Sequence, residues 1–176
     1  MARAVILLAL ALVLAALPVV GRAGAAVADA GTTTDSQAAG SLEGSLLGRI
    51  NRARQASGLR ILRVSSGLRQ AATAHARWLA RSGSFTHSSA DGSSPATRIK
   101  RYYRGSVVGE TLVWGSPSIS ADEALRRWLE SPPHRDVLLD SRFREIGLSA
   151  VREEDAPGTY GGLDVTVVVA DLGAPG

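Results

Sequence analysis

LDVTVVVA, residues 163–170, is the clearest β-strand in this sequence. Its polar side chains, Asp164 and Thr166, alternate with apolar ones, as they do in a strand that buries one face. A second strand is predicted over residues 146–150, where apolar residues alternate with smaller or polar neighbours. An acidic segment containing Gly and Pro, residues 153–162, joins the two strands. Two late strands joined by one such connection predict an antiparallel pair.

Helical spacing dominates the chain before these strands. Apolar residues recur three or four positions apart, and capping or breaking residues mark where each helix begins and ends. The predicted helices are a first over 42–53 that stops at Gly58, a second from Ser65 or Ser66 to about Arg81 with Gly83 beyond it, a short turn over 97–102, and a third that begins at Ser120 and ends at Pro132-Pro133. Helices that precede strands, with no internal repeat, predict one domain with a layered α+β fold.

The N-terminal segment is typical of an exported protein. Arg3 is followed by an uncharged, almost wholly apolar run over residues 4–20. Ala23-Gly24-Ala25 fits a signal-peptidase site, and Ala28-Asp29-Ala30 is a second candidate. We interpret residues 1–25 as a signal peptide. The alternative is an uncleaved membrane anchor, but the run is shorter than the roughly 20 residues of a spanning helix. Residues 26–40 are small and polar and are predicted to be a flexible tether, so the folded domain covers residues 41–176.

Composition narrows the classes of function. The chain has no cysteine, which excludes thiol catalysis, iron–sulfur clusters and thiolate zinc sites. Signal cleavage would remove Arg3 and Arg22 and no acidic residue, so the formal net charge of +4 would fall to +2. Basic and acidic residues are interspersed, as on an ordinary solvated surface. We therefore expect a secreted, extracellular or periplasmic monomer with no nucleic-acid partner and no transmembrane anchor after cleavage.

Two of the three histidines lie where predicted elements end. His87 follows a helix stop, His134 follows Pro132-Pro133, and Glu110 begins an apolar stretch. Two imidazoles and a carboxylate could hold zinc or another divalent cation with one open position, or they could act as acid and base. His75 instead lies on the apolar face of the second helix and is predicted to be buried and hydrogen-bonded to the backbone. The motifs of serine hydrolases, zincin metalloproteases and P-loop proteins are absent.

A series of short motifs then becomes recognisable by its order and spacing. In sequence these are Asn51-x-x-Arg54-x-x-x-Gly58-Leu59-x-x-Leu62, Ala71-Ala72-x-x-His75-Ala76, Phe85-x-His87-x-x-x-Asp91-Gly92, Arg98-Ile99, Gly109-Glu110, Trp128-x-x-Ser131-Pro132-x-His134-Arg135 and Glu145-Ile146-Gly147. Over residues 46–173 the chain resembles the bacterial branch of the CAP superfamily, which includes cysteine-rich secretory proteins, venom antigens and plant pathogenesis-related proteins.

The resemblance implies a three-layer α-β-α sandwich with a central antiparallel sheet and a cleft holding two histidines and acidic residues. His87 and His134 match the two histidines, and Glu110 matches the first glutamate. Some relatives bind zinc or another divalent cation there, others bind sterols or fatty acids in separate grooves, and hydrolytic activity has been proposed for parts of the family. The position of the family's second cleft glutamate is Ser131 here, with Glu130 one residue out of phase.

Other departures from the family are Thr111 after the cleft glutamate, Pro133 before the second histidine and the sequence after Thr166 in the last strand. The leading hypothesis is a secreted protein whose cleft binds a divalent metal or small ligand through His87, Glu110 and His134. One alternative is a hydrolase of peptides or cell-wall material, with a histidine as base and water as nucleophile. The other is a module that binds lipid or a cell-envelope component. Binding is modestly favoured over catalysis, because no nucleophile is visible and no second carboxylate is evident at the family position.

Overall fold

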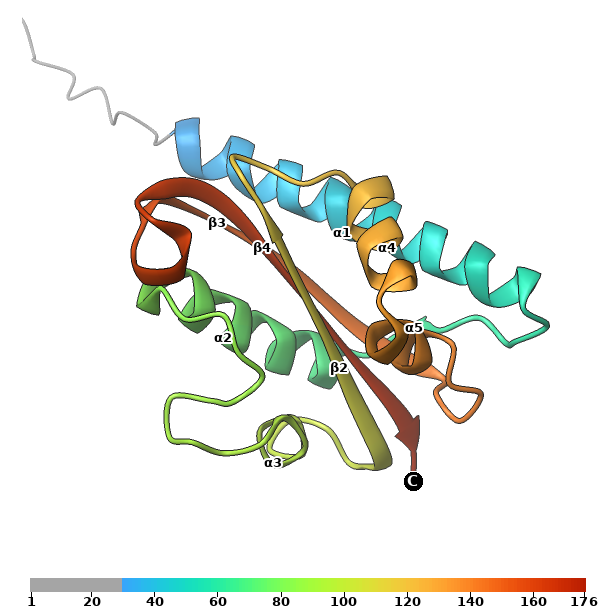
Figure 1. The fold of residues 1–176 in the computed structure, drawn as a ribbon. Helices are drawn as coiled ribbons and strands as arrows, with labels where there is room; N and C mark the ends of the chain where they lie inside the picture. The colour runs from blue at the N-terminus through green and yellow to red at the C-terminus, as the bar shows by residue number, and fades with distance from the viewer. Residues whose placement is uncertain (1–29) are drawn as a thin grey trace, which may run out of the picture.

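The structure, a computed structural model, describes residues 30–176, with side chains from residue 37 onward. The predicted signal peptide, residues 1–25, lies outside the described residues. The elements in chain order are α1 (Ala30–Ala56), β1 (Arg63–Val64), α2 (Ser66–Ser82), α3 (Pro95–Ile99), β2 (Gly105–Gly115), α4 (Ala121–Glu130), α5 (Pro132–Leu138), β3 (Glu145–Ala156), the 3-10 turn η1 (Gly158–Tyr160) and β4 (Leu163–Pro175) (Figure 1). No helix in the described part of the chain is long and apolar enough to cross a membrane.

The sheet has the strand order β1-β3-β4-β2. Strand β4 pairs antiparallel with both β2 and β3, which confirms the predicted antiparallel pair. The one departure from an antiparallel sheet is β1, two residues long, which runs parallel to β3. Helices α1, α4 and α5 lie on one side of the sheet, and α2 and α3 lie on the other (Figure 1). The α+β class and the three-layer sandwich are therefore confirmed.

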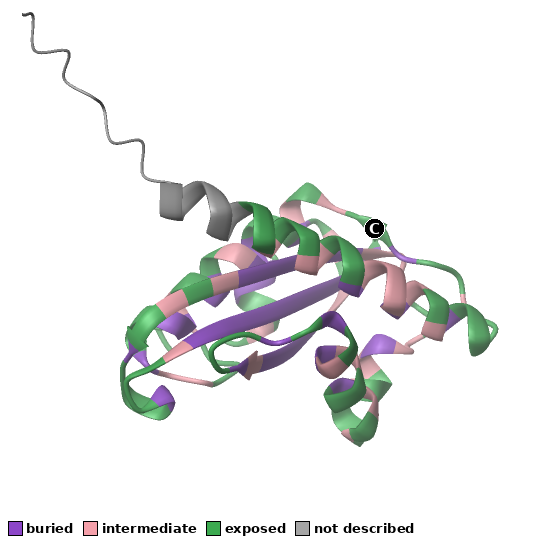
Figure 2. Ribbon diagram, turned by 90° about the horizontal axis from the view of Figure 1, so that it is seen from above, coloured by how far each residue is buried: buried purple, intermediate pink, exposed green. Residues whose placement is uncertain are grey.

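Strand β4 is buried on both of its faces. Val168 and its even-numbered neighbours belong to a core cluster with α1, α4 and α5, whereas Val167 and its odd-numbered neighbours belong to a second cluster with α2. The strand was predicted to bury one face only, but Thr166 is also buried because helices cover the sheet from both sides (Figure 2). The alternation of side chains along one strand thus joins two cores.

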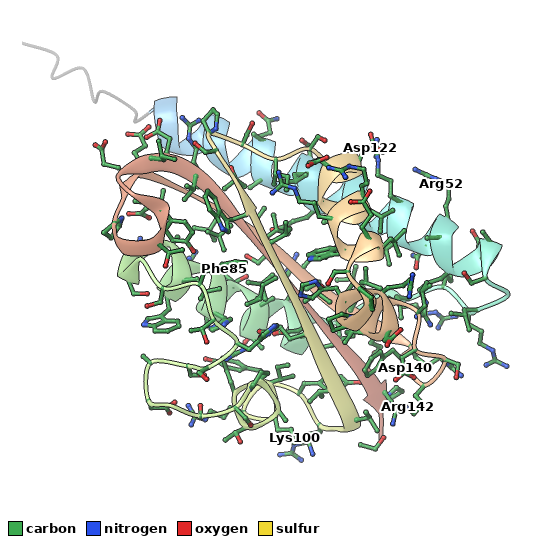
Figure 3. The ribbon with its side chains drawn as sticks, in the orientation of Figure 1. Arg52, Phe85, Lys100, Asp122, Asp140 and Arg142 are labelled. Carbon is green, nitrogen blue, oxygen red and sulfur yellow. The ribbon has the colours of Figure 1, made fainter. Side chains whose placement is uncertain are left out.

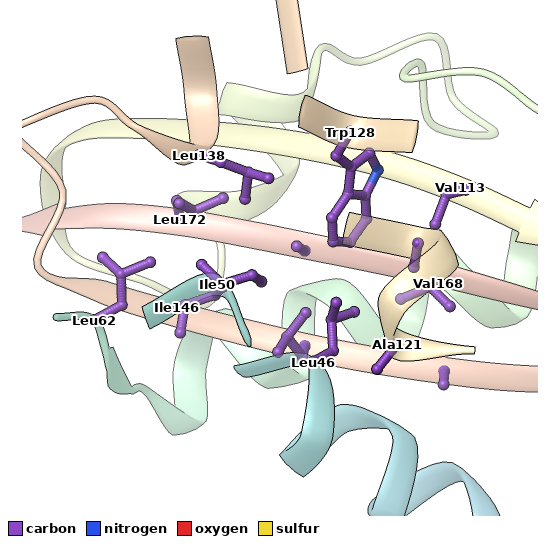
Figure 4. Close-up of a cluster of buried hydrophobic side chains, with 14 of the residues drawn as sticks. Leu46, Ile50, Leu62, Val113, Ala121, Trp128, Leu138, Ile146, Val168 and Leu172 are labelled. Carbon is purple, nitrogen blue, oxygen red and sulfur yellow. The ribbon is translucent and has the colours of Figure 1, made fainter. Parts of the chain in front are cut away.

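Trp128 anchors the α4 layer. Its indole is fully buried beside Leu46 and Ile50 of α1, and its Nε1 donates to the carbonyl oxygen of Leu112 at 2.9 Å (Figure 4). On the other side of the sheet, Gly147 lets α2 approach the strand so closely that a Cβ there would overlap the backbone of Leu68. These two contacts fix the helical layers against the sheet on either side of the site.

Three segments differ from the sequence prediction. Helix α1 begins at Ala30, within the range 26–40 predicted as a flexible tether, and Ala39 packs against the core, so the helix continues through the small residues before it. Helix α3 covers residues 95–99 rather than 97–102, because Ser94 caps it by accepting from the Thr97 amide. Pro132-Pro133 ends α4 as predicted but also begins α5, since proline is compatible with the first turn of a helix.

Candidate functional site

Glu110 lies at the centre of the site, on strand β2, with 6% of the residue exposed. Its Oε1 accepts a hydrogen bond from Nδ1 of His87 at 2.8 Å, and its Oε2 accepts one from Nη2 of Arg98. Because an ionised carboxylate can only accept, the proton of the neutral His87 ring lies on Nδ1 and the Nε2 lone pair is free. Half of the His87 side chain, 49%, is exposed, so this nitrogen belongs to a ring that solvent can reach.

Arg98 ties the loop that carries His87 to the sheet. It is 5% exposed and lies on α3, and its Nη1 donates to the carbonyl oxygen of His87 at 3.0 Å and to Ser89 Oγ at 2.8 Å. One guanidinium therefore holds the His87 backbone and the Glu110 carboxylate together. Its remaining donor, Nε, is buried with no hydrogen-bond partner among the described residues. Arg98 has a positioning role that sequence reasoning missed, although the residue was part of a recognised motif.

His134 reaches the site from the first turn of α5. Its ring centroid is 6.4 Å from that of His87, and the two planes are inclined at 44°. Partial burial lowers the pKa of His134, and the nearby His87 lowers it further, so the ring is held neutral. His134 also lines a cavity of about 210 Å³ together with Phe85 and Trp114, and Phe85 lies on the connection between α2 and α3 (Figure 3).

His75 is the buried histidine that the helix pattern predicted. It is 2% exposed, and its Nε2 lies 3.0 Å from the carbonyl oxygen of Thr86, which confirms the predicted bond to the backbone. The same nitrogen is 3.8 Å from Glu110 Oε2. Burial lowers the pKa of His75 to about 4, and the Glu110 carboxylate opposes part of that effect. The uncharged His75 ring therefore lines the site, and it stacks on Trp78 at a centroid distance of 5.6 Å.

A second carboxyl group, Asp171, faces Glu110 from strand β4. The two residues are direct partners in the β2–β4 register, and Asp171 is completely buried. Neither of its oxygens has a geometrically defined hydrogen-bond partner within residues 37–176. Burial raises the pKa of Asp171 well above its ordinary value, and the Glu110 charge raises it further, while Arg98 opposes part of the shift. The sequence signal was a lone acid at an inward position of an apolar strand.

The structure brings the three predicted residues together but gives them different roles. Both oxygens of Glu110 are occupied by His87 and Arg98, so Glu110 orients a histidine. Among the described residues, no group of three or more histidine, aspartate or glutamate side chains is arranged to hold a metal ion. Glu130 bonds Arg126 at 2.6 Å on the exposed face of α4, which leaves Asp171 as the acid beside Glu110.

The fold and the site define an α-β-α sandwich domain with paired histidines beside a buried carboxylate. Residues 47–170 match the model of the cysteine-rich secretory protein (CAP) family. The chain belongs to this family, and the predicted resemblance is confirmed. No curated protein matches the chain.

Solved structures show the same fold. An outer surface protein of Borrelia burgdorferi is 25% identical with a TM-score of 0.60, and the match covers 82% of this chain and 96% of that one. An extracellular protein of Bacillus anthracis containing an SCP domain is 19% identical with a TM-score of 0.64, covering 81% and 43%. A cysteine-rich secretory protein of Staphylococcus aureus is 20% identical with a TM-score of 0.55, covering 77% and 39%. The chain thus spans less than half the length of the last two.

Proposed function

We propose that this CAP domain binds a divalent cation, zinc above all, through the ring nitrogens of His87 and His134. The observation that carries the proposal is the hydrogen bond from His87 Nδ1 to Glu110, which leaves the lone pair of Nε2 to bind a metal ion. A carboxylate behind a metal-binding histidine fixes its tautomer and raises its basicity. Glu110 is then a positioning residue, and the three-ligand set expected from the sequence is replaced by two imidazoles.

The donor chemistry of the site fits this proposal. Metal ligands must be deprotonated, and the lowered pKa of His134 keeps that ring neutral. Two imidazoles suit zinc, and the remaining coordination positions would be left to water or to a small ligand. A bound cation would supply a Lewis acid to that ligand. Arg98 pairs with one carboxylate oxygen of Glu110, and the other oxygen accepts from His87 Nδ1.

The test is calorimetric titration of the purified protein with zinc. We expect binding to the wild type, loss of binding in the His87→Ala/His134→Ala double variant, and unchanged binding in Glu130→Gln, which removes a carboxylate from the far face of α4. Glu110→Gln should weaken binding by about 10- to 100-fold, because it removes the carboxylate that orients the His87 ring. Wild-type protein that takes up no zinc, or a double variant that binds as well as wild type, would refute the proposal.

Export completes the proposed function. The similar structures belong to an outer surface protein and an extracellular protein, and residues 1–25 have the pattern of a signal peptide. We infer that this chain is also secreted and meets its ligand outside the cytoplasm. Mass spectrometry of protein recovered from the culture medium should show an N-terminus near residue 26. An intact Met1 on cell-bound protein would contradict export by cleavage.

The hydrogen-bonded pair of His87 and Glu110 also supports a second candidate function, hydrolysis. A half-exposed imidazole whose Nδ1 donates to a buried carboxylate is the arrangement of a general base, with water as its nucleophile. Peptide and cell-wall fragments incubated with metal-free protein would distinguish the two functions. Turnover that disappears in His87→Ala and persists in chelator would establish the hydrolase, whereas zinc binding without turnover leaves binding as the function.

A further inference from the structure

A second concave site lies away from the histidine cleft, at the end of the molecule where the α1–β1 connection meets the start of β3. Arg60, Arg63 and Arg144 line a cavity of about 610 Å³ there, nearly three times the volume of the cavity beside His134. We call this cavity the arginine pocket. Its other walls include Gln55, Ile61 and Pro175, so it combines three guanidinium groups with apolar surface.

The positive charge of the arginine pocket is only partly balanced by the one carboxylate in its wall. Within the described part of the chain, none of its three arginines forms an ion pair. Glu145 is the one carboxylate in the wall, and its Oε2 accepts from the hydroxyl of Tyr103 at 2.6 Å. Asp140 lies on the loop between α5 and β3 and is engaged by Arg142 (Figure 3). The pocket therefore carries a net positive charge.

A buried arginine behind the pocket adds to its positive electrostatic potential. Arg54 is completely buried, and its guanidinium donates to backbone carbonyl oxygens, among them those of Arg60 at 2.9 Å and Leu138 at 2.6 Å. Carbonyl oxygens satisfy its hydrogen bonds without neutralising its charge. Burial lowers the pKa of Arg54, the positive charge of Arg144 lowers it further, and the nearby Asp140 opposes part of the shift.

The backbone that carries the three arginines is already fixed. The carbonyl oxygen of Arg60 is held by Arg54, the amide of Arg63 donates to the carbonyl oxygen of Arg144 at 2.9 Å, and the amide of Arg144 donates to Gly173 at 3.0 Å. The Nη1 of Arg144 donates to the carbonyl oxygens of Ser141 and, at 2.8 Å, Phe143, while its Nε and Nη2 have no hydrogen-bond partner among the described residues. An anion entering the pocket would meet donors on an ordered frame, which reduces the entropy lost on binding.

We propose that the arginine pocket binds the phosphate group of an anionic ligand. Guanidinium groups bind phosphate oxygens through paired, charge-assisted hydrogen bonds, and three of them can surround one such group. Ile61 lines the pocket with 48% of its surface exposed, so an apolar part of the same ligand would find a contact beside the charge. A phospholipid headgroup and a soluble phosphate ester both have this chemistry, and the proposal does not depend on the histidine cleft.

The experiment compares two variants that lose the same charge. Arg60→Gln/Arg63→Gln removes two pocket guanidiniums whose side chains have no hydrogen-bond partner in the described structure, so the fold should be retained. Arg52→Gln/Arg77→Gln removes two exposed arginines outside the pocket. Inorganic phosphate is titrated calorimetrically into each protein, and each is sedimented with phosphatidylcholine vesicles containing or lacking phosphatidylglycerol.

We expect the pocket variant to bind phosphate at least about tenfold more weakly than wild type and the control pair to bind as wild type does. If binding to phosphatidylglycerol vesicles falls in the pocket variant alone, the ligand is a lipid headgroup. If phosphate binding falls but no protein binds vesicles, the ligand is a soluble phosphate ester. Equal behaviour of the two variants in both assays, or no binding by wild type in either, would overturn the proposal.

Discussion

The buried pair of Arg98 and Glu110 offers the sharpest quantitative test of the site. The two residues are 5% and 6% exposed, so solvent screens their interaction little. In Glu110→Gln, Arg98 would keep its two neutral acceptors, His87 O and Ser89 Oγ, but would lose its ion-pair partner. Breaking a buried pair from one side costs about 3–5 kcal/mol, because the remaining charge stays uncompensated. That is a large part of the about 5–15 kcal/mol that stabilises a typical domain.

Urea unfolding followed by tryptophan fluorescence measures this loss, since the chain has three tryptophans. Glu153→Gln is the matched control: its partner Arg81 is at 3.7 Å and 72% of the Arg81 side chain is exposed, so the change should stay below about 1 kcal/mol. Arg98→Met/Glu110→Gln should be more stable than the two single variants predict together, because it removes both charges. A loss in Glu110→Gln no larger than that of the control would show that the pair is not buried as described.

Three further outcomes follow from the same region. The pKa of His75 is about 4 in the folded state against an ordinary 6.5, so the unfolded chain binds more protons between these pH values. The free energy of unfolding should therefore fall by about 3 kcal/mol as pH drops from 6.5 to 4. Urea unfolding at each pH measures this loss, and His75→Gln should flatten that part of the profile. The raised pKa of Asp171 has the opposite effect on stability, which is lost as pH rises above the ordinary value of 3.8. Asp171→Asn should therefore be more stable than wild type at pH 7 and lose that advantage near pH 3. An equal difference at both pH values would refute the assignment. Gly147→Ala should cost about 3 kcal/mol in thermal unfolding because its Cβ overlaps the backbone of Leu68, whereas Gly44→Ala, with open space around it, should be neutral or stabilising.

Local patterns predicted the elements whose signals are contained within a few residues. The caps at Ser65 and Ser120 and the positive φ of Gly83 mark helix ends in the sequence and in the structure. Strand β2 was not predicted, because Gly109 and the charged Glu110 interrupt its apolar pattern. The physical reason lies elsewhere in the chain: a Cβ at Gly109 would crowd Phe143, and Glu110 is neutralised by Arg98.

In the candidate site, too, local patterns identified the residues but not the partners that decide their roles. His87, Glu110 and His134 were found by their positions and by family motifs, and the structure places them together. Their roles depend on partners that no local pattern specifies. Asp171 becomes a neighbour of Glu110 only through the register of β4 with β2, and Arg98 reaches Glu110 from a separate helix. The assignment of Glu110 as a positioning group therefore required the tertiary structure.

The central position of β4 determines when this domain can become stable. Each helical layer packs against side chains that β4 supplies, yet β4 follows all the other elements in the chain. A polypeptide emerging N-terminus first, from a ribosome or through a membrane, has neither core closed until residues 163–172 are available. Folding of this domain is thus deferred until β4 has emerged, and a chain cut before residue 163 would lose both layers at once.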